Sequence, residues 1–72
     1  KEITAPNETR LIVQLLRISS LARKTSEARR LIEGGGIRID GKTVTSVDAV
    51  AESESDVVLC RGKSRFVRIR FV

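Results

Sequence analysis

The chain has 72 residues, and its 14 lysines and arginines outnumber its 9 aspartates and glutamates, which gives a formal net charge of +5. This length fits a single domain, and a hydrophobic fraction of 40% is typical of a folded chain rather than a disordered one. With no histidine and only one cysteine, Cys60, the sequence lacks the residues for Ser-His-Asp or Cys-His catalysis, for an internal disulfide and for a zinc site.

These exclusions narrow the function to binding. No apolar run reaches the roughly 18 residues that a membrane span needs. The absence of tryptophan and of a spare apolar helix face also argues against a membrane surface. We therefore expect a cytoplasmic, non-enzymatic domain without cofactor or metal, whose positive charge favours a polyanion as partner.

The N-terminal part predicts a lead-in followed by a helix. Residues 1–9 are expected to be irregular, and the lack of any methionine indicates a piece of a longer parent chain. Asn7 is a candidate N-cap. Apolar residues then recur at the helical period, which predicts a helix with an inner stripe of Leu11, Ile12, Leu15, Leu16 and Ile18. Ser19-Ser20 should loosen this helix, and Leu21-Ala22 should enter the core as a linker.

A second helix is expected from Thr25 or Ser26 to Glu33, with Ala28, Leu31 and Ile32 facing inward. The three glycines 34–36 end it. Because they follow a helix rather than a strand, they do not form a phosphate-binding loop. Two short helices with a tight joint also suit a helix-turn-helix, so a DNA-binding alternative stays open here.

The second half predicts strands. Ile37 and Ile39 alternate with Arg38, and Asp40-Gly41 is a strong signal for a two-residue hairpin turn that pairs Ile39 with Lys42. Residues 46–55 form a polar, acidic connection that could instead dock on a basic protein partner. Further strands are expected at 57–60 and 66–72, joined by a turn at 61–64.

Two side chains in these last strands need separate predictions. Cys60 lies in an apolar run and is expected to be a buried, structural thiol. Phe66 falls on the same side as Arg68 and Arg70 by strict alternation. A β-bulge that returns Phe66 to the core is the expected arrangement, and an RNA-facing ring is the alternative.

The basic residues predict a binding surface. Any single lysine or arginine is expected to be merely solvated, but helix, hairpin and last strand together could bring many of them onto one face. The candidates for that shared surface are Arg23, Lys24, Arg29, Arg30, Arg38, Lys42, Arg68 and Arg70.

Two blocks, residues 21–32 and 35–44, resemble the ribosomal-protein-S-four-type RNA-binding domain. The resemblance extends over residues 10–72 and implies an α+β fold with two short N-terminal helices packed on a small antiparallel sheet. In that family the second helix and the following hairpin form the RNA face, which carries over here to Arg23, Lys24, Ser26, Arg29, Arg30, Arg38 and Lys42. One departure is Lys24, which stands where relatives have a helix-capping serine. Thr25 must then cap the helix, or the cap is weak.

The stretch 61–69 further resembles the C-terminal end of tyrosyl-tRNA synthetases. This likeness implies a module that grips the body of a tRNA for a catalytic domain elsewhere in the parent chain, and it is compatible with a homodimeric parent. A pseudouridine synthase or a heat-shock protein of the same family is the alternative parent. A pseudouridine synthase would open with Arg-Leu-Asp, whereas this chain has Arg10-Leu11-Ile12. The helix-turn-helix alternative is weakened by a short second helix without asparagine or glutamine to read bases.

Overall fold

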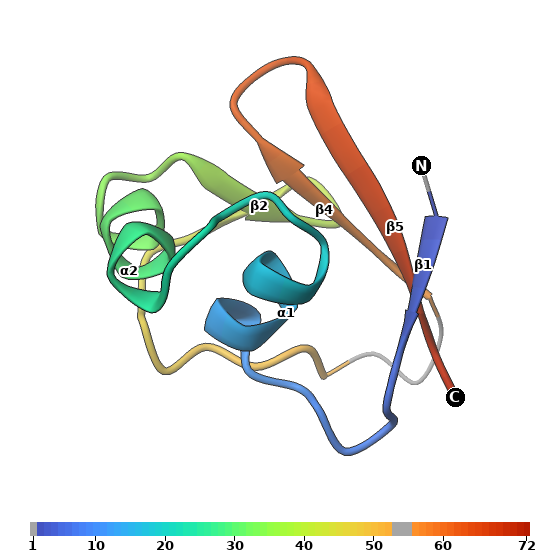
Figure 1. Cartoon of the computed structure of the whole chain (residues 1–72). Helices are drawn as coiled ribbons and strands as arrows, with labels where there is room; N and C mark the ends of the chain where they lie inside the picture. Colours follow the sequence, from blue (N-terminus) through green and yellow to red (C-terminus); the bar gives the residue numbers. More distant parts are fainter. Residues whose placement is uncertain (1, 53–55) are drawn as a thin grey trace.

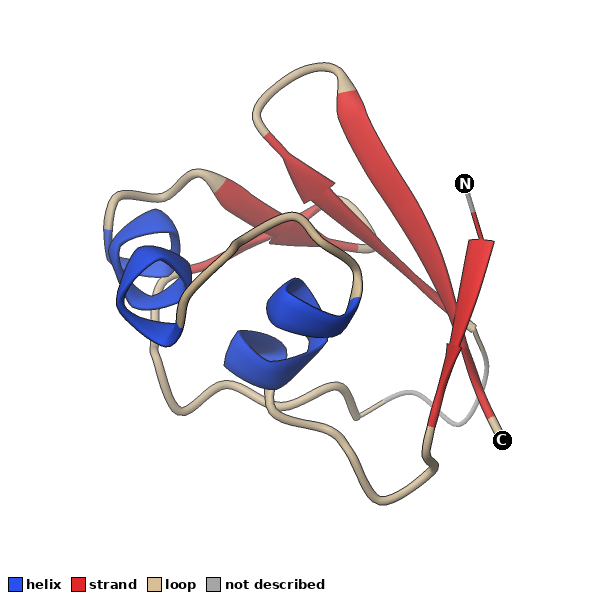
Figure 2. Cartoon of the chain, in the orientation of Figure 1, coloured by secondary structure: helices blue, strands red, loops and turns tan. Residues whose placement is uncertain are grey.

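The structure, a computed structural model, describes residues 2–52 and 56–72. Two helices lie against one face of a five-stranded sheet (Figures 1 and 2). In chain order the elements are β1 (Glu2–Ala5), α1 (Ile12–Ile18), α2 (Thr25–Glu33), β2 (Ile37–Ile39), β3 (Lys42–Val44), β4 (Val57–Arg61) and β5 (Arg65–Phe71). The expected α+β class is confirmed. Among the described residues, neither helix is long and apolar enough to cross a membrane.

The sheet has the order β1-β5-β4-β2-β3 and is mixed rather than antiparallel, because β1 pairs with β5 in parallel. The prediction that residues 1–9 are irregular is therefore wrong for β1. Ala5 is buried, and Val72 donates its backbone N–H to the Ala5 carbonyl at 2.9 Å. A four-residue edge strand is specified by the partner strand that it meets, so the local sequence carries little signal for it.

Helix α1 begins later than predicted, at Ile12, and has no side-chain cap. The reason lies in the preceding backbone, where Leu11 forms a bridge with Val50 and is held in an extended conformation. Asn7 is not the N-cap, since its side-chain oxygen instead accepts a hydrogen bond from Arg10 Nη2 at 2.6 Å.

The inner stripe of α1 also differs in part from its prediction. Leu15 and Leu16 are buried, and so is Val13. Ile18 is 44% exposed, so its prediction as a core residue is wrong. It is the last residue of the helix, directly before the C-cap Ser19.

Both helices end in the same hydrogen-bonded motif. After α1, the N–H of Ser20 bonds the carbonyl of Arg17 and the N–H of Leu21 bonds that of Leu16. After α2, Gly35 and Gly36 repeat this pattern with the carbonyls of Ile32 and Leu31. These are Schellman motifs, and each requires one left-handed residue, Ser20 at φ 64° and Gly35 at φ 75°. The motif after α1 turns Leu21 and Ala22 into the core, as predicted.

The hairpin between β2 and β3 is confirmed. Asp40 and Gly41 both have positive φ, 50° and 85°, as a type I′ turn requires. Ile39 pairs with Lys42, and Ile37 pairs with Val44.

The pairing of β4 with β5 is continuous from Val57 opposite Ile69 to Arg61 opposite Arg65. No extra residue interrupts it, so the predicted bulge at Phe66 is wrong and the ring is 54% exposed. A slip that buried Phe66 would have turned Val67 and Ile69 to solvent.

The sheet therefore has an inner face that the helices cover and an outer face that they leave open. Strand alternation places Ile37, Leu59, Val67 and Ile69 on the inner face, where all four are buried in the core. The outer face carries Arg38, Cys60, Phe66, Arg68 and Arg70. Cys60 is nevertheless buried, as predicted, and its Sγ donates to the carbonyl of Gly62 at 3.1 Å. Of the predicted acidic connection, residues 53–55 lie outside the described residues.

Candidate nucleic-acid interface

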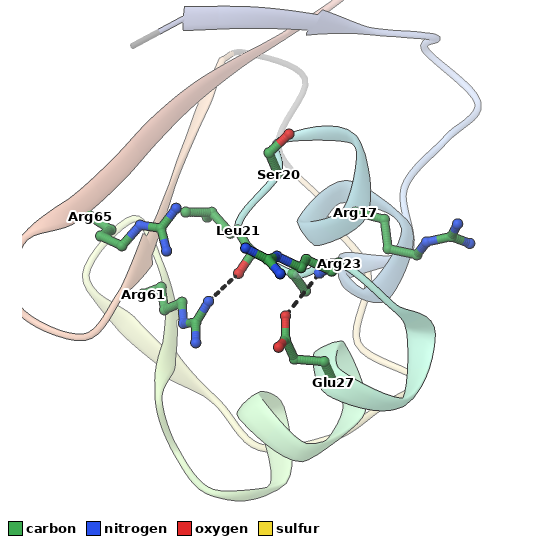
Figure 3. A pocket seen from close by; sticks show the side chains of 8 residues that line it. Arg17, Ser20, Leu21, Arg23, Glu27, Arg61 and Arg65 are labelled. Carbon is green, nitrogen blue, oxygen red and sulfur yellow. Dashed lines mark hydrogen bonds between the residues drawn. The ribbon is translucent and has the colours of Figure 1, made fainter.

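A basic hollow of about 730 Å³ opens between the joint of the two helices and the hairpin of β4 and β5 (Figure 3). Its side chains come from α1, the joint, the start of α2, and the facing ends of β4 and β5. We call it the arginine hollow, because it is lined by Arg17, Arg23, Arg61 and Arg65 together with Glu27. These five groups carry a formal charge of +3.

The strand register brings two of these arginines to the hollow. Arg61 and Arg65 face each other at the end of the β4–β5 ladder, and Arg61 also pairs with Ile37, so both side chains lie on the inner face. Arg61 Nη1 donates a hydrogen bond to the backbone carbonyl of Leu21 at 2.6 Å, which connects the sheet to the helix joint. Like charges directly opposite each other in a ladder are destabilising unless something compensates them. This pair therefore favours an anion nearby.

The helix joint supplies the opposite wall. In Figure 3 the guanidinium groups of Arg23, Arg61 and Arg65 gather around Leu21, whereas the side chain of Arg17 points away from them. Arg17 Nη1 instead lies 3.4 Å from Thr25 Oγ1. Arg17 thus marks the margin of the hollow.

Glu27 holds the start of α2 in place. Its Oε1 accepts a hydrogen bond from the backbone N–H of Arg23 at 2.8 Å. The N-cap position is Lys24, and no side chain caps the helix there, so the expectation of a weak cap is met. Glu27 compensates for the missing cap, because its carboxylate binds the N–H of Arg23 directly before the helix, in the manner of a capping box.

The other predicted residues of α2 are not among those that line the hollow. Lys24, Ser26, Arg29 and Arg30 are all exposed. Arg29 and Arg17 line a second, smaller depression, so the basic surface continues from the arginine hollow onto the outer side of α2.

The remaining predicted residues lie elsewhere, and the expectation that all of them converge on one surface is wrong. Arg38 and Arg68 are on the outer face of the sheet, since they alternate with the buried residues. Arg70 is also there and lies within 3.8 Å of carboxylates of Glu2 and Asp56. Lys42 belongs to a separate depression that Glu52 also lines.

The sequence interpretation did not select Arg17, Arg61 or Arg65 as site residues. The sequence does indicate that Arg61 and Arg65 lie opposite each other, because a short hairpin turn joins their two strands. Their side of the sheet depends on register. Within the described residues, no group of three histidine, cysteine, aspartate or glutamate side chains could hold a metal ion.

Comparison with known proteins decides the family. The family model of the S4 domain matches residues 10–58. The chain belongs to the S4 domain family. The earlier resemblance is thereby confirmed, and the mixed α+β architecture is that of an S4 domain.

Curated relatives of this S4 domain are tyrosine–tRNA ligases. The enzyme of Moorella thermoacetica is 40% identical over 68 residues, which cover 94% of this chain and 16% of that enzyme. The enzyme of Cupriavidus pinatubonensis is 47% identical over 58 residues, covering 81% and 14%. That of Nitrosomonas europaea is 36% identical over 59 residues, covering 82% and 14%. The chain thus spans only a small part of the length of these relatives.

Proposed function

We propose that this S4 domain binds structured RNA, and that the RNA is a tRNA held for the catalytic domain of a longer, cytoplasmic tyrosine–tRNA ligase. The observation that carries the proposal is the arginine hollow, where Arg61 and Arg65 face each other and Arg23 joins them. The names of the relatives support the choice of tRNA. They also favour a ligase over a pseudouridine synthase or a heat-shock protein as the parent.

The chemistry of the hollow suits a phosphate backbone. Within the described residues, the guanidinium groups of Arg23 and Arg65 have no hydrogen-bond or ion-pair partner. Each guanidinium offers several N–H donors in a plane and matches phosphate oxygens in a bidentate manner. Contacts of this kind set the position of the RNA, while the shape of an A-form helix supplies most of the discrimination.

The same backbone can continue along α2. Arg17 lines both the arginine hollow and the depression beside Arg29, so phosphates leaving the hollow would meet the outer side of that helix next. We assign Lys24, Ser26, Arg29 and Arg30 to this second part of the grip. Arg38, Lys42, Arg68 and Arg70 lie away from this grip, so the proposal gives them no direct RNA contact. A homodimeric parent remains a prediction.

The division between the two faces of the sheet makes a matched experiment possible. Arg23→Glu combined with Arg65→Glu reverses two exposed charges in the hollow. Arg38→Glu combined with Arg68→Glu makes the same change of net charge on the outer face. Charge-assisted hydrogen bonds contribute about 1.5–3 kcal/mol each, so the first pair should weaken binding of a tyrosine tRNA transcript by roughly 100-fold or more.

The outer-face pair should weaken binding by less than about tenfold, which a filter-binding titration at fixed salt would measure. Thermal melting of each variant checks that the fold is intact. Equal losses from both pairs would contradict a localised grip and favour general attraction of a polyanion. Equal affinity of the unmodified domain for B-form DNA would revive the helix-turn-helix alternative.

A further inference from the structure

The arginine hollow contains one group of opposite chemistry. Arginine side chains only donate hydrogen bonds, whereas Glu27 is the one side-chain carboxylate among the described residues that line the hollow, and a carboxylate only accepts. Phosphate oxygens also only accept. A phosphate in the hollow would therefore gain nothing from this carboxylate, which would repel it.

The position of the Glu27 carboxylate is held by the backbone. Oε1 accepts the Arg23 N–H at 2.8 Å, so the side chain cannot swing away without losing that bond. No ion pair joins it to the four arginines of the hollow, all of which the structure describes. The second oxygen is therefore left as an acceptor in the hollow that Arg23 and Arg65 also line.

The sugar–phosphate backbone of RNA has one donor, the 2′-hydroxyl of ribose, and DNA lacks it. We propose that Glu27 accepts a hydrogen bond from a ribose 2′-hydroxyl adjacent to a phosphate held by Arg23 and Arg65, and so selects RNA against DNA. This inference rests on the proposed function and names the group that gives it specificity. DNA has no 2′-hydroxyl. With DNA in the hollow, nothing would therefore offset the repulsion between the Glu27 carboxylate and the phosphate.

Glu27→Gln separates this role from helix capping. The amide oxygen still accepts the Arg23 N–H, while the other atom becomes a donor and the charge is lost. Glu33→Gln is the matched control, because Glu33 is exposed at the opposite end of α2. Glu27→Ala is a second variant, which removes the acceptor and the cap together.

The probes are a tyrosine tRNA transcript and the same sequence made with 2′-fluoro nucleotides, which keep an A-form helix but cannot donate from the 2′ position. The unmodified domain and the Glu33→Gln control should prefer the hydroxyl-bearing RNA by about tenfold, the effect of one hydrogen bond to a charged group. In both Glu27 variants this ratio should fall to within about twofold of one, with part of the change coming from tighter binding of the fluoro RNA.

A ratio that Glu27→Gln leaves unchanged would overturn the inference and reduce Glu27 to a capping residue, while the proposed function would stand. If the unmodified domain binds neither RNA, the proposed function fails and this inference fails with it. The measured quantity is the ratio of the affinities of one variant for the two RNAs. A general loss of stability lowers both affinities alike and leaves this ratio unchanged.

Discussion

Ser20 shows how a single residue sets the shape of the helix joint. It adopts φ 64°, a left-handed conformation that glycine reaches without strain and that is unfavourable for a residue with a Cβ. No side-chain hydrogen bond of Ser20 to another described residue offsets this strain. The left-handed turn leads into Leu21, which is buried in the core, and both residues line the hollow.

Ser20→Gly should therefore stabilise the domain. Glycine relieves the left-handed strain, and this gain exceeds the extra conformational entropy that glycine loses on folding. We expect the free energy of unfolding to rise by about 0.5–1 kcal/mol. In a domain of this size the midpoint of thermal unfolding should rise by roughly 2–8 °C, which circular dichroism can measure.

The matched control is Gly35→Ser in the equivalent position after α2. At Gly35, with φ 75°, an added Cβ meets nothing within 4 Å, so only the backbone strain changes. This variant should lower the unfolding midpoint by a similar amount. A Ser20→Gly variant that melts lower than the unmodified domain would contradict the strain argument.

At the level of elements, β1 is the strand that the sequence did not predict, and the structure makes it part of the fold. It covers the free edge of β5 from Arg68 to Phe71, and Ile3 packs against the core (Figure 1). Burial of apolar side chains contributes about 25 cal/mol for each Å² removed from water. An exposed edge is also a site for pairing with another chain.

Deletion of residues 1–5 should consequently destabilise the domain by about 2 kcal/mol or more and increase its aggregation. Glu2→Ala is the control, since it removes only an exposed contact to Arg70 at 3.7 Å and should change the free energy of unfolding by less than about 1 kcal/mol. Urea unfolding followed by circular dichroism gives both values. Unchanged stability after the deletion would show that β1 does not stabilise the fold.

Across the molecule as a whole, the basic residues gather in separate regions of the surface and are not spread evenly. The net charge of +5 includes Arg70, which two carboxylates partly neutralise, and arginines on the outer face. The arginine hollow and the adjacent α2 surface form a separate basic region, with Arg17 common to both parts. We propose that this region meets successive phosphates of one backbone.

The salt dependence of binding should report the size of that region. If the four arginines of the hollow and one or two of α2 meet phosphates, the logarithm of affinity should fall against the logarithm of salt concentration with a slope of about −3.5 to −5.5. Titrations of a tyrosine tRNA transcript at several salt concentrations measure the slope. A slope near −9 would mean that the outer face binds RNA as well.

The amino-acid sequence was sufficient wherever neighbouring residues decide the structure. The helix from Thr25 to Glu33 and the hairpin at Asp40-Gly41 were predicted with their bounds, because helical periodicity and turn chemistry act over a few residues. The family resemblance over the helix and hairpin was carried by the same local blocks.

Long-range pairing decided the rest. The parallel pairing of β1 depends on a partner more than 60 residues away along the chain, between Glu2 and Arg68. The split of the basic residues between two faces depends on strand register, in which a shift by one residue reverses the side of every side chain. For the same reason only the tertiary structure could bring Arg61 and Arg65 to the helix joint and place Glu27 among them.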